Sequence, residues 1–514
     1  MTAIPEHSLN QLGERAAQAL EIGARLQHGP SQRLIDTAFR RELEAQLPLF
    51  DALSRVDLAH TLVLIENNIM PVQDGQALLA ALLQLRQCPA DFQPQAAHGD
   101  IYTNREVWLT SHASAAGWLG TGRARREAIT TAYIIKQREL VLDLIDALHG
   151  YLETLIARSE QGKALLMSDY TYLQSAQPTS FGHYLLGFAF PALRDLDRLQ
   201  ALYARLNLSP AGCGSNNGSR IPQSRQRLAE LLGFDGLVTH ARDAMWQADL
   251  PIETAAVLST ITVNLDRLAE DIQILATDEF GLLALDDQHA RASKIMPQKK
   301  NPFALTHIRG LANNLIGFLA SAAAMGRTTT GQPDNRLQLY GMLPQSTIDV
   351  SDAIELMSEI LANLIFNHQH ALEKIDHGFC LATDLAEVLV LKTGLSFREA
   401  HKLVGMLVKR HLPTGHFNDL TLAEIANCAN ELFGKTISLE TVDLNLALNP
   451  YAAVEARQET GCAASANMAD MLEQCRQSLF QSRQWRSEQI QRLENAEVML
   501  EQAIQQQLNS VTPI

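Results

Sequence analysis

The stretch PIETAAVLSTITVNLDRLAEDIQIL, residues 251–275, carries the strongest structural signal in this chain. Its apolar residues recur at steps of three and four, at Leu258, Ile261, Leu265, Leu268, Ile272 and Leu275. This is the period of a helix with one continuous apolar seam, and the proline at its start suits the first helical turn. The stretch therefore predicts one long helix that packs along its length against other helices.

Three further stretches have the same helical period. They run from about Arg125 to Arg158, from Phe303 to Met325 and from Ser346 to Ile375. Long helices with continuous apolar seams pack best at small crossing angles, as a bundle. Several of these stretches carry apolar residues on a second face, which favours packing against further copies of the chain, although one large monomeric helical domain remains an open alternative.

Signals for β-strands are scarce, because no stretch keeps up an alternation of apolar and polar residues. We therefore expect an all-α protein with an N-terminal helical domain at 1–115, a central long-helix bundle at 116–370 and a C-terminal helical domain at 371–514. Residues 467–508, rich in Gln, Glu and Arg, predict one or two surface helices. The irregular, Gly- or Pro-bearing segments, where the chemistry is expected, are 117–126, 168–182, 209–222, 281–302 and 328–343.

Composition excludes several classes of protein. The 514 residues include 57 acidic and 42 basic ones, a net charge of −15, which argues against a nucleic-acid partner. The six cysteines form no CxxC pair, and the histidines near the irregular segments lack HxxxH or HExxH spacing, so we expect no metal and no cofactor. The sequence has no apolar run long enough for a membrane span and no apolar core of a signal peptide near its start, so we expect a cytoplasmic protein.

The segment RASKIMPQKKNP, residues 291–302, is the most unusual of the irregular segments. It gathers one hydroxyl, three lysine ammonium groups and two side-chain amides between two apolar helices, and Pro297 and Pro302 keep it from becoming helical. Such a segment suits anions, carboxylates in particular, and lysines beside Ser293 favour its deprotonation. A solvated basic connector is the alternative.

Two other segments add polar groups. Residues 209–220 hold three glycines whose spacing is not that of a phosphate loop, so a tight turn and a backbone anion site both remain open. Arg123, Arg125 and Arg126 precede or begin the helix at about 125–158, where positive charge opposes the helix dipole, so they indicate an anionic ligand or else a surface basic patch.

Several of these segments together resemble the fumarase/aspartase superfamily, in its argininosuccinate lyase branch. Residues 293–302, SKIMPQKKNP, are similar to the branch's GSSxMPQKKNP, and residues 278–281, DEFG, to its QEFG. Residues 171–178, TYLQSAQP, followed by SFGH at 180–183, are similar to THLQxAQP and SFGH. Residues 121–125, TGRAR, resemble TGRSR, and the similarity extends over most of the chain.

The resemblance implies an all-α long-helix bundle of the fumarase/aspartase type. It further implies a homotetramer with a central core of twenty helices and active sites formed by loops of three subunits. The implied substrate is a small-molecule dicarboxylate, and the implied reaction is a β-elimination. A base removes a proton next to a carboxylate, an aci-carboxylate forms, and fumarate leaves after the C–N or C–O bond breaks.

The resemblance also assigns roles to residues of this chain. Ser293 matches the catalytic base, and Lys299 and Asn301 match the carboxylate-binding lysine and asparagine. Thr171 matches a threonine that binds a substrate carboxylate. Gln338 matches a substrate-contacting glutamine.

The chain departs from the branch at several of these positions. The histidine of THLQ is Tyr172, and its acidic partner is Thr306, so the usual proton donor to the leaving nitrogen is missing. A phenol can donate a proton, although it holds it more tightly than imidazolium, and Tyr172 is the candidate replacement. The second serine of GSS is Lys294, and the asparagine after TGRSR is Arg126.

These departures predict a specificity different from that for argininosuccinate. A substrate with an additional carboxylate, or a small N-substituted aspartate, would suit Arg123, Arg126 and Lys294. The expected function is that of a carbon–nitrogen lyase that releases fumarate from a succinyl adduct, or runs in reverse. A family member repurposed for a structural or regulatory role, and a C–O or N–N lyase of specialised metabolism, remain alternatives.

Overall fold

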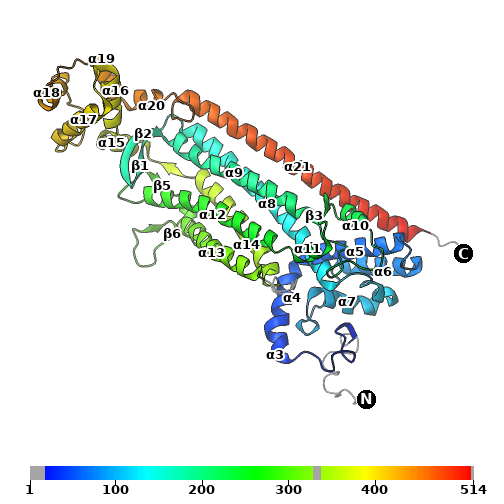
Figure 1. Cartoon of the computed structure of the whole chain (residues 1–514). Helices are drawn as coiled ribbons and strands as arrows, with labels where there is room; N and C mark the ends of the chain where they lie inside the picture. The colour runs from blue at the N-terminus through cyan, green and yellow to red at the C-terminus, as the bar shows by residue number, and fades with distance from the viewer. Residues whose placement is uncertain (1–17, 328–336, 511–514) are drawn as a thin grey trace.

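Five long helices run side by side through the molecule (Figure 1). The computed structural model describes residues 18–327 and 337–510. The long helices are α8 Arg125–Gly162, α9 Phe181–Leu206, α12 Asp249–Leu275, α13 Phe303–Met325 and α14 Leu337–Ala362. The seam at 251–275 therefore lies on one helix, as its period predicts, and the all-α bundle is confirmed.

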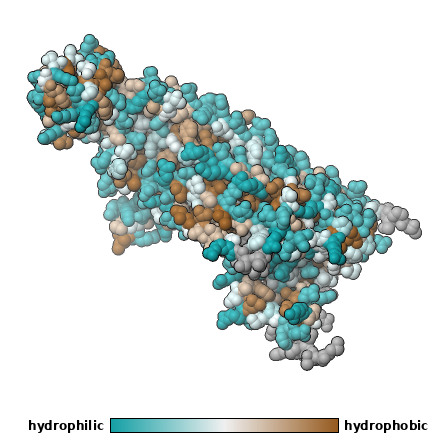
Figure 2. Space-filling model, viewed as in Figure 1, coloured by the Kyte–Doolittle hydropathy of each residue, from teal (hydrophilic) through white to brown (hydrophobic). Residues whose placement is uncertain are grey.

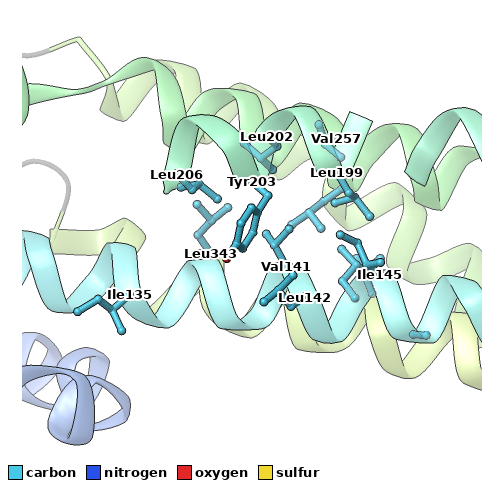
Figure 3. Packing of buried hydrophobic residues seen from close by; sticks show 14 of the residues in the cluster. Ile135, Val141, Leu142, Ile145, Leu199, Leu202, Tyr203, Leu206, Val257 and Leu343 are labelled. Carbon is cyan, nitrogen blue, oxygen red and sulfur yellow. The ribbon is translucent and has the colours of Figure 1, made fainter. Parts of the chain in front are cut away.

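The bundle is held together by the apolar seams of these helices. On α12, Leu258, Leu268 and Ile272 are buried. Figure 3 shows how side chains of α8, such as Val141 and Ile145, pack against Leu199 of α9. Burying a side chain of this size contributes about 1.5–3 kcal/mol, so the seams supply much of the stability of the bundle.

Helix α14 differs from the prediction at both ends. The segment 328–343 was expected to be irregular; residues 328–336 lie outside the described residues, and from Leu337 onward the chain is helical and passes through Pro344. Burial of Leu339 and Leu343 against the bundle outweighs the local cost of the proline. The helix ends at Ala362 because Ile365–Phe366 (β8) pairs with Leu283–Ala284 (β5), and α15 begins at His368.

Shorter helices cover the end of the bundle where α8 begins. They are α3 Gln32–Leu34, α4 Arg40–Gln46, α5 Phe50–Glu66, α6 Val72–Arg86, α7 Ile101–His112, α10 Arg225–Leu231 and α11 Ala241–Trp246. Between α3 and α4 the chain makes one turn of π-helix, Ile35–Phe39. Helix α5 contacts both α8 and α6, so this part is packed onto the bundle.

At the other end of the bundle, where α8 ends, the C-terminal part begins. It contains α15 His368–Asp376, α16 Ala382–Thr393, α17 Phe397–His411, α18 Leu422–Phe433, α19 Thr441–Ala447 and α20 Pro450–Glu455. Helices α16 to α19 enclose an apolar core of their own. The division of the chain into three domains stays a prediction.

The last helix, α21 Ser465–Asn509, runs back along the whole bundle (Figure 1). It contacts α8 and α9, and Leu472, Leu479 and Leu500 are buried there. The prediction of one or two helices for 467–508 is met by one helix of 45 residues. Within the described residues, none of the helices combines the length and the apolar character that crossing a membrane requires.

Strands occur only as short pairs in the described part of the chain. The segment 168–182, expected to be irregular, contains most of an antiparallel hairpin, β1 Leu166–Thr171 and β2 Gln174–Ser180. A second small pair is β6 Arg291–Ala292 with β7 Lys300–Asn301. The pair formed by β3 Leu208–Ser209 and β4 Gly236–Leu237 is parallel, and the pair of β5 with β8 is antiparallel. The hairpin β1–β2 and the pair β6–β7 contain or flank the segments 168–182 and 291–302, which the sequence analysis identified as candidate sites of chemistry.

Candidate active site

Ser293 lies in a loop that projects from the bundle between β6 and β7 (Figure 1). The Ser293 amide donates to the Lys299 carbonyl at 3.2 Å, which closes the base of the loop. The Ser293 hydroxyl oxygen accepts the backbone N–H groups of Met296 at 3.0 Å and Ile295 at 3.4 Å. Two donors on this oxygen stabilise a negative charge on it more than they stabilise the neutral hydroxyl.

The loop has little cover from its own chain. Ile295 is 84% exposed and Met296 42% exposed, and Figure 2 shows apolar surface on the projecting loop. Large apolar side chains at a surface indicate contact with another molecule. Ser293 is not enclosed in the packed core of its own chain.

The three lysines of the loop have different surroundings. Lys300 donates to the Leu285 carbonyl at 2.5 Å and pairs with Asp287 at 2.6 Å, so it anchors the loop to the bundle. Lys294 and Lys299 are exposed. Lys299 borders a cleft of about 570 Å³ between the loop and the C-terminal end of α12, where its ammonium group can meet an anionic ligand.

The Asn301 amide has a structural contact. Its Nδ2 donates to the Arg291 carbonyl at 2.9 Å, across the two strands. The amide nitrogen of Asn301 is therefore engaged in holding the loop, while its predicted contact with a substrate carboxylate stays a prediction.

Thr171 and Tyr172 lie at the tip of the β1–β2 hairpin. Tyr172 and Leu173 form its two-residue turn with φ of 54° and 58°, the left-handed conformation that hairpin turns of this length require. Neither residue is a glycine, so the turn stores strain of the kind found at functional sites. Tyr172 is 98% exposed, and Thr171 is exposed beside it.

The hairpin is rigidly joined to helix α9. The Ser180 hydroxyl caps α9 by accepting the His183 amide at 3.0 Å. Gly162 and Gly182 approach so closely that a Cβ on Gly182 would lie 2.3 Å from the Ser159 carbonyl oxygen. The end of α8, the hairpin and the start of α9 therefore form one unit that presents Thr171 and Tyr172 outward.

Arg123, Arg126 and Gln338 lie at the opposite end of the bundle. The 38 residues of α8 separate the two ends by about 55 Å. Gln338 is exposed in the first turn of α14. The predicted site residues of one chain therefore form two groups. Arg123, Arg126 and Gln338 lie where α8 begins, and Ser293, Thr171 and Tyr172 lie where α8 ends (Figure 1).

The two arginines each pair with a carboxylate of the chain itself. The Arg123 side chain is only 1% exposed and donates to Asp57 at 2.8 Å. Arg126 donates to Glu42 on α4 at 2.9 Å. Asp57 is shared with Arg105, and the binding of a further substrate carboxylate by Arg123 and Arg126 stays a prediction. The sequence did not reveal Asp57 and Glu42 as their partners.

The glycine-rich segment 209–220 binds an anion of the chain itself. The Gly212 and Gly214 amides donate to the two carboxylate oxygens of Glu127, each at 2.6 Å. Burial raises the pKa of Glu127 to about 7. The backbone anion site that the glycines suggested is therefore occupied by Glu127.

Comparison with known proteins identifies the family to which the chain is similar. The model of a lyase family matches residues 93–317, and the model of the argininosuccinate lyase C-terminal region matches residues 379–455. The chain is 31% identical over 452 residues to an argininosuccinate lyase of Methanosarcina barkeri, covering 87% of this chain and 91% of the relative. It is 30% identical over 450 residues to the enzyme of the same name from Archaeoglobus fulgidus, with the same two coverages.

The chain is also similar in fold to solved structures of lyases. A crystal structure of EDDS lyase in complex with formate has a TM-score of 0.83 and 28% identity, over 98% of this chain and 99% of that one. A class II fumarase from Schistosoma mansoni has a TM-score of 0.66 at 14% identity, over 87% of this chain and 96% of that one. At that identity the fumarase shows the shared fold alone.

Proposed function

The chain belongs to the fumarase/aspartase superfamily, in its argininosuccinate lyase branch, and from this premise we propose that it releases fumarate from an N-substituted aspartate by β-elimination. The protein is a lyase by family; the broken bond, the product and the substrate are the proposal. The observation that carries it is the environment of Ser293, whose hydroxyl oxygen accepts two backbone N–H groups within a lysine-bearing loop.

In the proposed reaction, Ser293 acts as its alkoxide, and the oxygen takes the proton from the substrate carbon next to a carboxylate to become a neutral hydroxyl. The electron pair left behind spreads into that carboxylate as a doubly charged aci-carboxylate, which Lys299 and Asn301 stabilise. The pair then forms the double bond of fumarate as the C–N bond breaks, and the amine nitrogen gains a proton. In the reverse direction the same steps add an amine to fumarate.

Tyr172 is the proposed donor of the proton to the leaving nitrogen. It stands where the branch has histidine, and the strained turn presents its hydroxyl fully to the surroundings. Thr306 stands where the branch has the acidic partner of that histidine, so Tyr172 has no such partner. The Thr306 hydroxyl instead donates to the Pro302 carbonyl at 3.3 Å. We expect amines that leave easily to be better substrates than strongly basic ones.

We propose that the complete site forms between several copies of the chain, in a homotetramer. Two observations support this: the site residues lie at opposite ends of α8, which is about 55 Å long, and one face of α13 is exposed among the described residues. That face contains Ile316, Gly317 and Ala320, all exposed, and a Cβ on Gly317 would meet no atom within 4 Å. Small and apolar residues of this kind suit close helix packing against another chain.

The experiment is to incubate the protein with fumarate and a series of amines and amino acids, and to identify adducts by mass. In the elimination direction, fumarate is followed by its ultraviolet absorbance. Ser293→Ala is expected to lower the rate about 10²- to 10⁴-fold. The matched control is Ser487→Ala, on the exposed side of α21, which should leave the rate unchanged.

The outcomes separate the alternatives. Full activity of Ser293→Ala would remove Ser293 as the base. Inactivity of the intact oligomer toward every succinyl adduct would favour a repurposed role, and a product from C–O or N–N cleavage would assign a different lyase reaction. Rapid cleavage of argininosuccinate itself would contradict the altered specificity.

A further inference from the structure

The β1–β2 hairpin changes register halfway along, between its base and the tip that carries Tyr172. Ser168 of β1 stands opposite Pro178 of β2. Two residues further along β1, Tyr170 stands opposite Ser175, which is three residues back along β2. Strand β2 therefore has one residue more than β1 in this interval, which makes a β-bulge. A bulge bends and twists a hairpin, so it sets the direction in which the residues beyond it point.

Cys380 contacts both sides of this bulge. It lies in the turn between α15 and α16 and is 1% exposed. Its thiol donates to the Ser168 hydroxyl oxygen at 3.2 Å, and its sulfur lies 2.8 Å from the Ser175 hydroxyl oxygen. The two hydroxyl oxygens lie 2.7 Å apart. One thiol therefore joins the last paired residue of β1 before the bulge to the first paired residue of β2 beyond it.

The hydrogen-bond partners of Ser168 assign the protons of this triangle of Cys380, Ser168 and Ser175. The single Ser168 hydroxyl proton goes to the Asp169 carbonyl at 2.8 Å, so the Ser168 oxygen only accepts within the triangle. It receives the Cys380 thiol proton and can receive the Ser175 hydroxyl proton. Asp169 stands between the two registers and has no counterpart on β2, so the Ser168 hydroxyl satisfies its backbone carbonyl instead. The triangle therefore supports the bulged conformation.

The surroundings of Cys380 fix its position independently of the hairpin tip. Ile375 of α15 and Val454 of α20 pack with it in a small apolar cluster. In the same turn, a Cβ on Gly378 would lie 2.9 Å from the Ser175 hydroxyl oxygen, so the chain approaches the hairpin more closely than a side chain would allow. The C-terminal part of the chain therefore holds Cys380 against the bulge from a fixed base.

We propose that Cys380 is a positioning residue for the elimination: through its hydrogen bonds to the two serines it fixes the bulge, and so the place at which the hairpin presents Tyr172. The inference rests on the proposed function, in which Tyr172 gives a proton to the leaving nitrogen. A general acid works only within hydrogen-bond reach of the atom that it protonates, and a misplacement of about 1 Å can cost about a hundredfold in rate. Cys380 is buried, so it acts through the hairpin and not on the substrate.

The first test compares Cys380→Ala, which removes the thiol, with Cys380→Ser, which keeps a donor and an acceptor at the same place. Hydrogen exchange of the backbone amides at 170–175, followed by mass spectrometry, reports on the hairpin tip and needs no activity. We expect exchange to be about tenfold faster in Cys380→Ala, the effect of losing one hydrogen bond of a buried group. Cys380→Ser should exchange within about threefold of wild type, because its hydroxyl restores the triangle.

Two further variants keep the test independent of how well Cys380→Ala folds. Ser175→Ala removes the hairpin side of the triangle at an exposed position and should accelerate exchange of the tip in the same way. Cys428→Ala is the matched control, because it removes a buried sulfur from the core of α16 to α19, which is separate from the cluster around Cys380. It should leave exchange of the hairpin tip unchanged.

The second test is a double-mutant cycle between Cys380 and Tyr172, with an amine that the protein adds to fumarate. Cys380→Ala should lower kcat about tenfold or more in the wild-type background, because the proton donor is displaced. In the Tyr172→Phe background it should lower kcat by less than about twofold, since no proton donor is left to displace. Cys380→Ser should recover most of the lost kcat, and Cys428→Ala should leave kcat unchanged.

The outcomes separate this inference from the proposed function. If fumarate addition occurs but exchange of the tip is unchanged in Cys380→Ala and Ser175→Ala, the positioning role fails and the lyase function stands. The same conclusion follows if Cys380→Ala lowers kcat equally in both backgrounds, or if Cys380→Ser recovers nothing. If no amine adds to fumarate but exchange of the tip accelerates in both variants, Cys380 does fix the hairpin and the proposed function fails. An unchanged tip without fumarate addition would overturn both.

Discussion

The Arg123 guanidinium donates to one oxygen of the Asp57 carboxylate at 2.8 Å, and the Arg105 guanidinium donates to the other oxygen, also at 2.8 Å. All three side chains are at most 1% exposed. One buried carboxylate thus pairs with two buried cations, which come from α7 and from the segment before α8. This contact fixes the start of α8 against α5.

Replacing Asp57 by asparagine should strongly destabilise the protein. Two guanidinium groups would remain buried without a countercharge, and breaking a buried ion pair in this way costs about 3–5 kcal/mol. The free energy of unfolding in urea, compared between wild type and Asp57→Asn, measures the effect. The control is Glu153→Gln, which removes an exposed ion pair with Arg483 and should change the free energy by less than about 1 kcal/mol. Equal effects of the two variants would refute the structural role of Asp57.

Glu127 should make the stability of the protein depend on pH. Burial raises its pKa in the folded state to about 7 from 4.5, so the folded state binds the proton more tightly than the unfolded state. The stabilisation from this group is therefore fully present below about pH 4.5 and is lost as the pH rises through 7, by about 3 kcal/mol in all. Glu127→Gln cannot titrate and should lack this part of the pH dependence. Unfolding midpoints of both proteins between pH 5 and 8 would show it, and parallel curves would contradict it.

Lys299 and Lys300 are neighbours in sequence that should affect different kinetic parameters. Lys299→Ala removes the proposed carboxylate contact and should raise the KM for the dicarboxylate. Lys300→Ala removes the anchor to Leu285 and Asp287, so it should lower kcat by leaving the Ser293 loop less well positioned. Steady-state kinetics of both variants test this, and an unchanged KM in Lys299→Ala would count against its role.

Mixed oligomers should reveal whether one site uses several chains. Ser293→Ala and Tyr172→Phe are each expected to be nearly inactive. If the loop of one chain meets the hairpin of another, subunit exchange between the two variants should restore part of the activity, because some sites then receive both wild-type segments. Continued inactivity after exchange, verified by native mass spectrometry, would place Ser293 and Tyr172 of one chain in the same site.

Local sequence patterns were sufficient for the bundle and for the reactive segments. The helix at Asp249–Leu275 follows from an apolar period that needs no distant partner to be recognised. The loop at 291–302 follows from its prolines and its gathered charges, and the structure does place it outside the helices. Both features depend on residues a few positions apart, where physical constraints are short-ranged.

The pairing of charges depended on residues far apart in the chain, and the sequence did not predict it. Asp57 meets both Arg105 and Arg123, Glu42 meets Arg126, and Glu127 binds the glycine-rich segment, so Arg123 and Arg126 each pair with a carboxylate from another part of the chain. A pocket lined by Asp169 and Asp271 likewise forms only where β1 meets the start of α9 and the end of α12. The electrostatic energy of a side chain depends on its distance from every other charge and from water, and only packing of the whole chain sets those distances.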